Sequence, residues 1–318
     1  MTSTELPGIR EIQSAAKAIE GIASRTPLVE SPALSKLAAR RVYLKLECFQ
    51  PTKVFKIRGA YNKMSRLSER SVVAASSGNH GIAVAYSSML LGKKCTIVVP
   101  ETAVKEKTDA IQDFGAEVVK AGKLSEEREA KARQIATTTD SAFVHPFNDP
   151  DVIAGQGTCG VEICEQLDDL DTVLVPVGGG GLISGVSIAI KSAKPGARVI
   201  GVEPQGAPKL SSSLAAKHIV KVPKPASMAD GLVPSSLGGL TFRACSRYVD
   251  GALTVTEDEI FLATATMANA ARIIAEPSGA TPLAPLISRA HKVPGEKVVV
   301  VVSGGNISRE LLVRILTA

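Results

Sequence analysis

Short runs of β-branched and other apolar residues alternate along this chain with segments of helical periodicity. Several of these runs, such as KVVVVVSG at 297–304, are apolar without a break, which is typical of parallel strands buried on both faces of a sheet. We therefore predict an α/β fold built on open, twisted parallel sheets. The predicted strands are VYLKLE (42–47), SVVAASS (71–77), KCTIVVP (94–100), AEVVKA (116–121), AFVHPF (142–147), TVLVPVG (172–178), RVIGVEP (198–204), ALTVTE (252–257) and KVVVVVSG (297–304).

The spacing of these units predicts two lobes. Compact strand–helix units are expected to form a small domain, 70–146, inserted in a large domain made of 1–69 and 147–318, with a ligand site in the cleft between them. The segment 205–237, rich in Pro, Ser and Lys, is predicted to be irregular and to cover the large lobe or form the rim of the cleft. Helices are predicted at 82–92, 104–115, 125–139 and 151–167.

Composition narrows the kind of ligand and the compartment. Seven Phe, four Tyr and no Trp give little material for stacking nucleic-acid bases, whereas scattered charges that sum to +6 suit a small anion. Five cysteines without a C-x-x-C pair argue against a disulfide framework or a zinc site and favour a reducing compartment. No apolar run approaches about 18 residues, so we predict no membrane span, no signal peptide and a cytoplasmic location.

Three glycine-rich turns follow predicted strands, at the strand ends where open α/β sheets bind ligands. They read SSGNHG (76–81), GGGG (178–181) and SGGN (303–306). Four consecutive glycines leave backbone N–H groups unshielded, and the next helix adds the positive end of its dipole, so 178–181 is either a phosphate cradle or a plain tight turn. It fits neither G-x-G-x-x-G with a following ribose-binding acid nor G-x-x-x-x-G-K-[ST]. The pattern favours a phosphate monoester.

Lys56 lies in VFKIRGA (54–60), between an apolar approach and the start of a predicted helix. Burying an unpaired lysine costs free energy or drives off its proton, so either its stem reaches the surface or its amine is meant to react. A reactive amine, a cradle for a phosphate monoester and two polar glycine turns together suit pyridoxal 5′-phosphate, which binds a lysine through its aldehyde.

The chain also resembles a known family along essentially its whole length. FKIRGA, SSGNHG, VGGGG and SGGN, together with HPFNDPDVIAGQGT (145–158), ADGL (229–232) and EPSGA (276–280), match in order the fold-type II pyridoxal-phosphate enzymes, in the branch of the serine/threonine dehydratases and serine racemase. The resemblance implies a tryptophan-synthase-β-like fold of two α/β lobes, with the cofactor in the interlobe cleft. It also implies a homodimer.

The resemblance implies that Lys56 binds the cofactor covalently and later moves the α-proton of the substrate. Asn79 would hydrogen-bond the phenolic oxygen of the ring, or else cap a helix, and Phe55 would lie beside the ring or belong to the core. Ser303 would face the pyridine nitrogen, unless it only forms a turn. Because a hydroxyl is a weak donor, the ring would be a poor electron sink, which favours prompt loss of a β-hydroxyl over transamination. The phosphate would be bound by the N–H groups of Gly178, Gly179, Gly180, Gly181 and Leu182.

Ser77 is implied to be a second catalytic residue, on the face of the α-carbon opposite Lys56, where its hydroxyl could move a proton or only help to hold the substrate. Arg128 could bind a substrate carboxylate, including a second one at the β-position, or be one more charge on an exposed helix. His145 could lie near the substrate or be structural. The substrate carboxylate would be held by Ser76, Ser77, Gly78, Asn79 and His80.

One segment departs from the pattern of the family. Relatives with a cation site beside the phosphate loop use an acid, a backbone carbonyl four residues later and a second acid six residues later. Here these positions hold Glu203, Ala207 and Lys209. Because an ammonium cannot ligate a cation, either no divalent ion binds or the Lys209 amine partly replaces it. We predict no required metal, and activity that survives a chelator.

The resemblance favours a pyridoxal-phosphate lyase that converts a small β-hydroxy amino acid, such as serine, threonine or 3-hydroxyaspartate, into a 2-oxo acid and ammonia. The alternative is a serine- or aspartate-type racemase, or one enzyme with both activities. The rivals from other classes are a β-replacement synthase, a cofactor-binding sensor without turnover, and a nicotinamide oxidoreductase, which the missing ribose-binding acid disfavours.

Overall fold

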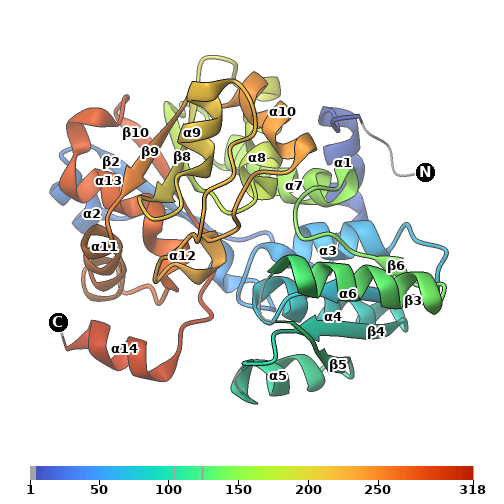
Figure 1. Cartoon of the computed structure of the whole chain (residues 1–318). Coiled ribbons are helices and arrows are strands. Elements are labelled where there is room, and N and C mark those ends of the chain that lie inside the picture. The colour runs from blue at the N-terminus through green and yellow to red at the C-terminus, as the bar shows by residue number, and fades with distance from the viewer. Residues whose placement is uncertain (1–4, 104, 123–124, 318) are drawn as a thin grey trace.

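The computed structural model describes residues 5–103, 105–122 and 125–317 and contains two separate sheets surrounded by helices (Figure 1). Neighbouring strands are parallel in both sheets, except that β1 and β2 are antiparallel. The predicted α/β class with parallel sheets is confirmed. The six-stranded sheet has the order β1 (Leu28–Glu30), β2 (Arg41–Leu46), β10 (Lys297–Val302), β7 (Thr172–Pro176), β8 (Arg198–Pro204) and β9 (Gly251–Val255). The four-stranded sheet has the order β5 (Glu117–Lys120), β4 (Lys94–Val99), β3 (Ser71–Ala75) and β6 (Ala142–Phe143).

Strand β10 shows why the unbroken apolar runs form central strands. Val298, Val300 and Val302 pack into one core cluster of the six-stranded sheet. Val299 and Val301 pack into the cluster on the other face, and all five side chains are fully buried. Because successive side chains of a strand point to opposite faces, five valines in a row supply two apolar layers at once. Burying each valine contributes roughly 1.5–3 kcal/mol.

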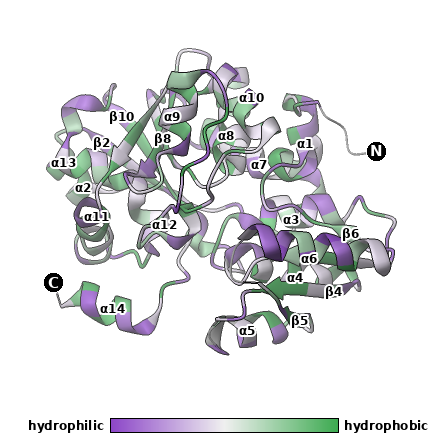
Figure 2. Ribbon diagram, viewed as in Figure 1, coloured by the Kyte–Doolittle hydropathy of each residue, from purple (hydrophilic) through white to green (hydrophobic). Residues whose placement is uncertain are grey.

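Helices α7 and α8 cross closely on one face of the six-stranded sheet because glycines leave out side chains at the contact. A Cβ at Gly185 would lie 2.3 Å from the carbonyl oxygen of Ile153 and 2.4 Å from the nitrogen of Gly157. Helix α8 is largely hydrophobic in Figure 2, as its complete burial from Gly181 to Ile190 requires. The helices around this sheet are α1 (Ile9–Ala18), α2 (Pro32–Ala38), α7 (Pro150–Gln166), α8 (Gly181–Ala193), α9 (Lys209–Ala216), α10 (Gly239–Tyr248), α11 (Glu257–Asn269), α12 (Pro277–Ala280), α13 (Ala284–Ser288) and α14 (Arg309–Leu316).

Helix α3 (Lys56–Met64) packs against both units. Its Ala60 and Met64 lie in the core of the four-stranded sheet, whereas its other side meets α7, where a Cβ at Gly155 would lie 2.4 Å from the carbonyl oxygen of Arg58. The small sheet is also covered by α4 (Asn79–Leu91), α5 (Lys105–Gln112) and α6 (Ser125–Thr138). Short 3-10 segments are η1 (Glu47–Phe49), η2 (Asp230–Leu232), η3 (Thr281–Leu283) and η4 (Ala290–Lys292). Nowhere in the described ranges is a helix long and apolar enough to cross a membrane.

The domain boundaries stay a prediction. All strands of the small sheet lie within 70–146, whereas α3, which shares their core, precedes that range. Residues 1–4 and 318 of the predicted large domain lie outside the described residues, as does 104, where a helix is predicted to begin.

The predicted strand 142–147 is wrong beyond Phe143, where β6 ends. The ring nitrogen Nδ1 of His145 accepts hydrogen bonds from the backbone N–H groups of Phe147, at 3.2 Å, and Asn148, at 2.8 Å. These bonds turn the chain, and Pro146 has no N–H to give to a sheet.

The prediction that 205–237 is irregular is wrong at α9. Glu203, at the end of β8, lies beside the first turn of this helix, and its carboxylate accepts hydrogen bonds from the backbone N–H groups of Leu210 and Ser211, each at 2.8 Å. A carboxylate from a neighbouring strand therefore does the work of a helix cap. The short strand β1, which pairs with β2, was not predicted either.

Candidate active site

Lys56 is the first residue of α3, and its amine points back toward the segment that joins the two sheets. Its Nζ donates a hydrogen bond of 2.8 Å to the carbonyl oxygen of Pro146 and lies 5.2 Å from the centre of the Phe55 ring. Burial lowers the pKa of the Lys56 amine to about 8. At neutral pH a larger fraction of this amine is therefore unprotonated than in a solvated lysine, which suits attack on an aldehyde.

A buried cluster of charges holds α3 in place two residues after Lys56. The Arg58 guanidinium binds both carboxylate oxygens of Glu47, at 2.7 and 2.8 Å, and both oxygens of Glu162, at 2.6 and 2.9 Å. Lys45 adds a second cation, 2.5 Å from Glu162, so the two positive and two negative charges balance. Burial alone would raise the pKa of Glu47, but the Arg58 charge outweighs it and the pKa is lowered.

The four-glycine turn lies between β7 and α8, and its geometry leaves no room for side chains. A Cβ at Gly179 would lie 2.3 Å from ring carbons of Phe147, and Gly180 has a φ of +92°, which an L-residue rarely adopts. The first N–H groups of a helix have no acceptor within it. This N-terminus of a 13-residue helix therefore offers unshielded donors and a positive dipole end, which fits a phosphate group.

Ser303 lies at the end of β10, directly against the residue that precedes Lys56. The backbone N–H of Phe55 donates a 3.0 Å hydrogen bond to the carbonyl oxygen of Ser303, and Val54 forms an isolated bridge with Gly304. The side chain of Ser303 is buried. The third glycine turn, at a strand end, therefore lies against the segment that leads into Lys56.

Asn79, at the start of α4, connects the two sheets. Its side-chain nitrogen donates a 2.7 Å hydrogen bond to Glu276, and its side-chain oxygen accepts one of 2.7 Å from Asn306. The helix cap is Gly78, and Asn79 makes no side-chain cap bond. Sequence reasoning did not single out Glu276 or Asn306, although both lie in motifs noted above, EPSGA and SGGN. Phe147, which packs on the glycine turn, was missed as well.

The SSGNHG turn follows β3 and is partly exposed. The Ser76 hydroxyl accepts a 3.2 Å hydrogen bond from the N–H of Gly78. Within the described part of the chain the Ser77 hydroxyl has no hydrogen-bond partner. His80 is buried, and its Nε2 lies 2.9 Å from the carbonyl oxygen of Val144. Burial, helped by the charge of Lys56, lowers the pKa of His80 to about 3, so this ring is neutral and Nε2 is the donor.

Two further candidates lie farther along the small sheet. Arg128 lies on α6, where its guanidinium donates a 2.8 Å hydrogen bond to Ser125, and burial lowers its pKa. Its contact with a substrate stays a prediction. His145 turns the chain after β6, as described above, and burial lowers its pKa to about 4. The ring of His145 is therefore neutral at pH 7, and whether it lies near the substrate stays a prediction.

The residues predicted as a degenerate cation site do meet. The Lys209 ammonium donates 2.9 Å hydrogen bonds to the carbonyl oxygens of Ala207 and Leu232, and lies 3.7 Å from Glu203. Burial lowers the pKa of Lys209 to about 8, against the opposing pull of Glu203. The ammonium occupies the oxygen atoms that a metal ion would need, so these residues do not fit a divalent ion.

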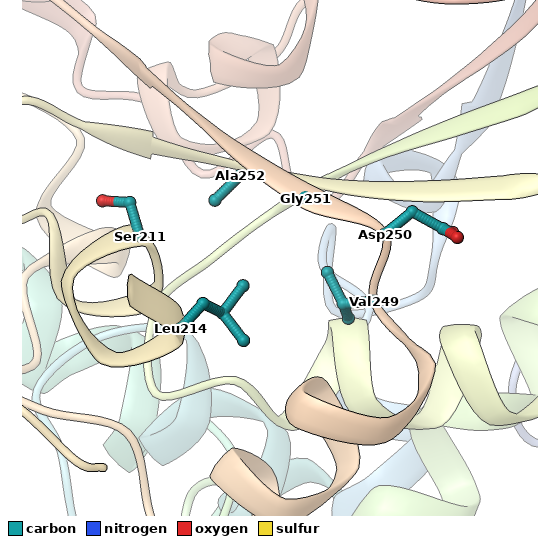
Figure 3. A pocket seen from close by; sticks show the side chains of 6 residues that line it. All are labelled: Ser211, Leu214, Val249, Asp250, Gly251 and Ala252. Atoms are coloured by element: carbon teal, nitrogen blue, oxygen red, sulfur yellow. The ribbon is translucent and has the colours of Figure 1, made fainter. Parts of the chain in front are cut away.

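A separate hollow of about 370 Å³ lies between α9 and β9 (Figure 3). It is lined by Ser211, Leu214, Val249, Asp250, Gly251 and Ala252. The carboxylate of Asp250 points away from Leu214 and is already engaged by Lys191 and by the N–H of Val199. The hollow contains none of the predicted site residues, and we assign it no function.

The fold and the site together define a class of protein, an α/β enzyme with an amine placed to bind an aldehyde and a helix N-terminus placed to hold a phosphate. Residues 19–304 match the family model described as pyridoxal-phosphate dependent enzyme. The chain belongs to this family, and the predicted cofactor is confirmed.

Individual relatives agree with the predicted branch of the family. L-threonine ammonia-lyase of Thermotoga maritima is 43% identical over 312 residues, which cover 97% of this chain and 78% of the relative. Serine racemase of Dictyostelium discoideum is 40% identical over 316 residues, or 97% of each chain. L-threo-3-hydroxyaspartate ammonia-lyase of Saccharomyces cerevisiae is 36% identical over 306 residues, or 95% of this chain and 94% of the relative. The crystal structure of a T.th. threonine deaminase has a TM-score of 0.92 at 38% identity and covers 95% of this chain and 99% of that one.

Proposed function

We propose that this enzyme is an ammonia-lyase that dehydrates a small β-hydroxy amino acid to a 2-oxo acid and ammonia. The observation that carries the proposal is the Lys56 amine, whose lowered pKa makes it a usable base near neutral pH. The names of the relatives support the reaction class, because two are ammonia-lyases acting on threonine and on 3-hydroxyaspartate.

The residues present fit the cofactor, and each has a separate task. When bound, pyridoxal phosphate supplies an electron sink that acidifies the Cα–H bond of the substrate. Lys56 would hold the cofactor aldehyde until the substrate amine displaces it, and the freed Lys56 amine would then take the proton from Cα. The N–H groups of 178–182 hold the phosphate, and Phe55 supports one side of the ring. Ser303 offers only a weakly donating hydroxyl to the ring nitrogen, which favours loss of the β-hydroxyl as water over longer-lived carbanion chemistry.

Substrate recognition is proposed for the turn that follows β3. Its hydroxyl and N–H groups suit the substrate α-carboxylate, with contributions from Ser76, Ser77, Gly78 and Asn79. His80 is already bonded to Val144, so we expect its contribution to come from its backbone N–H. Arg128 on α6 is the proposed ligand for a second carboxylate, which would select 3-hydroxyaspartate over serine or threonine.

The alternative function, an amino-acid racemase, rests on Ser77. Racemisation needs a second group that gives a proton to the face of Cα opposite Lys56. The Ser77 hydroxyl is partly exposed and has no hydrogen-bond partner among the described residues, so it is available for that task. The serine racemase relative supports this alternative. One active site could carry both reactions, since both begin with removal of the same proton.

The test is a substrate panel with two variants. We expect the wild-type enzyme to release a 2-oxo acid and ammonia from at least one of L-serine, L-threonine and L-threo-3-hydroxyaspartate. Lys56→Ala should lower that rate by roughly a thousandfold or more. Ser77→Ala should retain elimination from the L-isomer within about tenfold but abolish formation of the D-isomer. Synthesis of a thioether or thiol from O-acetylserine and sulfide, without deamination of any β-hydroxy amino acid, would instead identify a β-replacement synthase.

We further propose that the enzyme is a cytoplasmic homodimer with a small domain, 70–146, that closes on the substrate. The absence of paired C-x-x-C cysteines supports the compartment, and the resemblance to the family supports the dimer. Light scattering of the purified protein measures the mass directly, and a mass near 33.1 kDa would contradict the dimer.

A further inference from the structure

The buried ammonium of Lys209 lies among three oxygen atoms near the carboxyl end of β8. Two are the carbonyl oxygens of Ala207 and Leu232, each 2.9 Å from Nζ, and the third belongs to Glu203, at 3.7 Å. The side chains of Lys209 and Glu203 are both completely buried. Carbonyl and carboxylate oxygens are the ligands that hard metal ions take, and here a lysine amine takes them.

The contact distances distinguish this arrangement from a simple buried ion pair. The ammonium lies closer to the two carbonyl oxygens than to the Glu203 carboxylate. That carboxylate is directed to the first turn of α9, where it accepts hydrogen bonds from the N–H groups of Leu210 and Ser211 and from the Ser211 hydroxyl. Lys209 therefore links two backbone segments, at Ala207 and Leu232, in addition to its longer contact with the Glu203 carboxylate.

One of these pieces supports the phosphate cradle. Leu232 is the last residue of η2, and Gly231 is the middle one. The carbonyl oxygen of Gly231 packs so closely on Gly178 that a Cβ at Gly178 would lie only 2.7 Å from it. The N–H of Gly231 donates a 3.0 Å hydrogen bond to Ser278, on α12. By binding the carbonyl of Leu232, Lys209 therefore holds η2, the segment that packs against Gly178, the first glycine of the cradle.

The charges explain why lysine and a divalent ion exclude each other here. An acid at 209 would place two carboxylates around the carbonyl of Ala207, and their charge of −2 would call for a divalent ion. Glu203 and Lys209 instead sum to zero without any ion. A metal ion among the same oxygens would face the ammonium within about 3 Å, where like charges repel strongly because no water screens them.

We propose that the Lys209 ammonium is the resident cation of this site, and that it makes the phosphate cradle independent of divalent metal ions. Lys209 is thereby a positioning residue for the cofactor, acting through η2. The inference goes beyond the proposed reaction, because it concerns how the cofactor is held and not which substrate is consumed.

The experiment converts the site to one that needs a metal. Wild type and Lys209→Asp, both as holoenzymes, are compared by thermal unfolding and by titration with pyridoxal phosphate, in EDTA and in millimolar Ca²⁺ or Mg²⁺. We expect no response to either condition in the wild type. Lys209→Asp in EDTA should bind the cofactor roughly tenfold more weakly or worse and unfold at a lower temperature, and Ca²⁺ or Mg²⁺ should restore both.

Two further variants keep the test decisive. Lys217→Asp makes the same change of charge at an exposed position of the same segment, and its cofactor affinity should not respond to metal ions. Lys209→Met keeps the volume of the side chain but not its charge. It should therefore weaken cofactor binding, and no metal ion should restore that binding. This variant tests the inference if Lys209→Asp does not fold. A wild type weakened by EDTA, a folded Lys209→Asp indifferent to both ions, or a Lys209→Met with unchanged cofactor affinity would each overturn the inference. None of these readouts requires turnover, so failure here is distinct from failure of the proposed reaction.

Discussion

The proposed reactivity of Lys56 follows from where α3 begins. The helix starts at this residue, and the amine turns into a partly buried space where its hydrogen-bond partner is the neutral carbonyl oxygen of Pro146. Burial lowers the pKa of this amine to about 8. A carboxylate at this place would do the reverse, because it would stabilise the ammonium.

This pKa predicts how fast the cofactor attaches at different pH values. Only the neutral amine attacks an aldehyde, so the rate of covalent attachment to the apoprotein should rise with pH and level off above about 8. At pH 7 about a tenth of Lys56 would be neutral, against well under a thousandth of an ordinary lysine. The measurement is the growth of the cofactor absorbance after mixing at pH 6 to 10, with borohydride trapping of the Lys56 peptide.

Free Nα-acetyl-lysine, measured in the same buffers, is the control for titration of the cofactor itself. Its rate should keep rising through pH 10, because its amine has the usual pKa. A protein rate that follows the same rising curve would show that burial does not lower the pKa of Lys56.

Helix α3 is positioned by charge and not by a cap. Its N-cap residue, Phe55, makes no side-chain cap bond. Arg58, in the first turn of the helix, instead ties it to Glu47 after β2 and to Glu162 on α7. A buried pair of this kind adds little net stability compared with apolar packing, but it fixes the orientation of the groups it joins, and removing one partner is costly.

Replacing Arg58 tests that account. Arg58→Met would leave two carboxylates, Glu47 and Glu162, facing each other with only Lys45 to compensate. We expect the free energy of unfolding to fall by about 3–5 kcal/mol, as measured by urea denaturation with the cofactor removed. Arg10→Met, at an exposed position of α1, is the matched control and should change stability by less than about 0.5 kcal/mol. A small loss for Arg58→Met would mean that the cluster does not hold α3.

The small and large units of the molecule meet at the proposed cofactor site, and Asn79 joins them there. Its amide links α4 of the small unit to Glu276 and Asn306 of the large one. Because an amide both donates and accepts, it can satisfy a carboxylate and a second amide at once. In the structure as it stands, these two bonds connect the SSGNHG turn to the large unit.

Asn79→Asp should loosen this joint. The change removes the donor to Glu276 and places two carboxylates together, which costs about 1–3 kcal/mol. Hydrogen exchange should become faster at 276–280 and 304–306, and the effect should shrink as the pH falls and one carboxyl is protonated. Asn269→Asp, an exposed change of the same charge on α11, should leave exchange in both segments unchanged. Equal exchange in wild type and Asn79→Asp would contradict a joint at Asn79.

Much of the molecule follows from local patterns. The valine run of β10 predicts a buried parallel strand, and the glycine quartet predicts a turn with unshielded N–H groups, because periodicity and turn chemistry act within a few residues of one another. The role of Lys56 is instead what the resemblance to the family implies. The same patterns explain the failures. The run 142–147 resembles a strand, yet the ring of His145 turns the chain within it. The serine-rich start of α9 resembles a loop, yet Glu203 caps it.

The tertiary structure alone decided which distant residues meet. Arg58 finds Glu162 across 104 positions, Asn79 finds Glu276 across 197, and Lys209 reaches the carbonyl of Leu232 rather than water. Such pairings depend on how whole sheets and helices pack, and the periodicity of a segment does not contain that information. The sequence therefore predicts candidates such as Lys56 and the glycine quartet, whereas Glu276, Asn306 and the partners that hold each side chain required the fold.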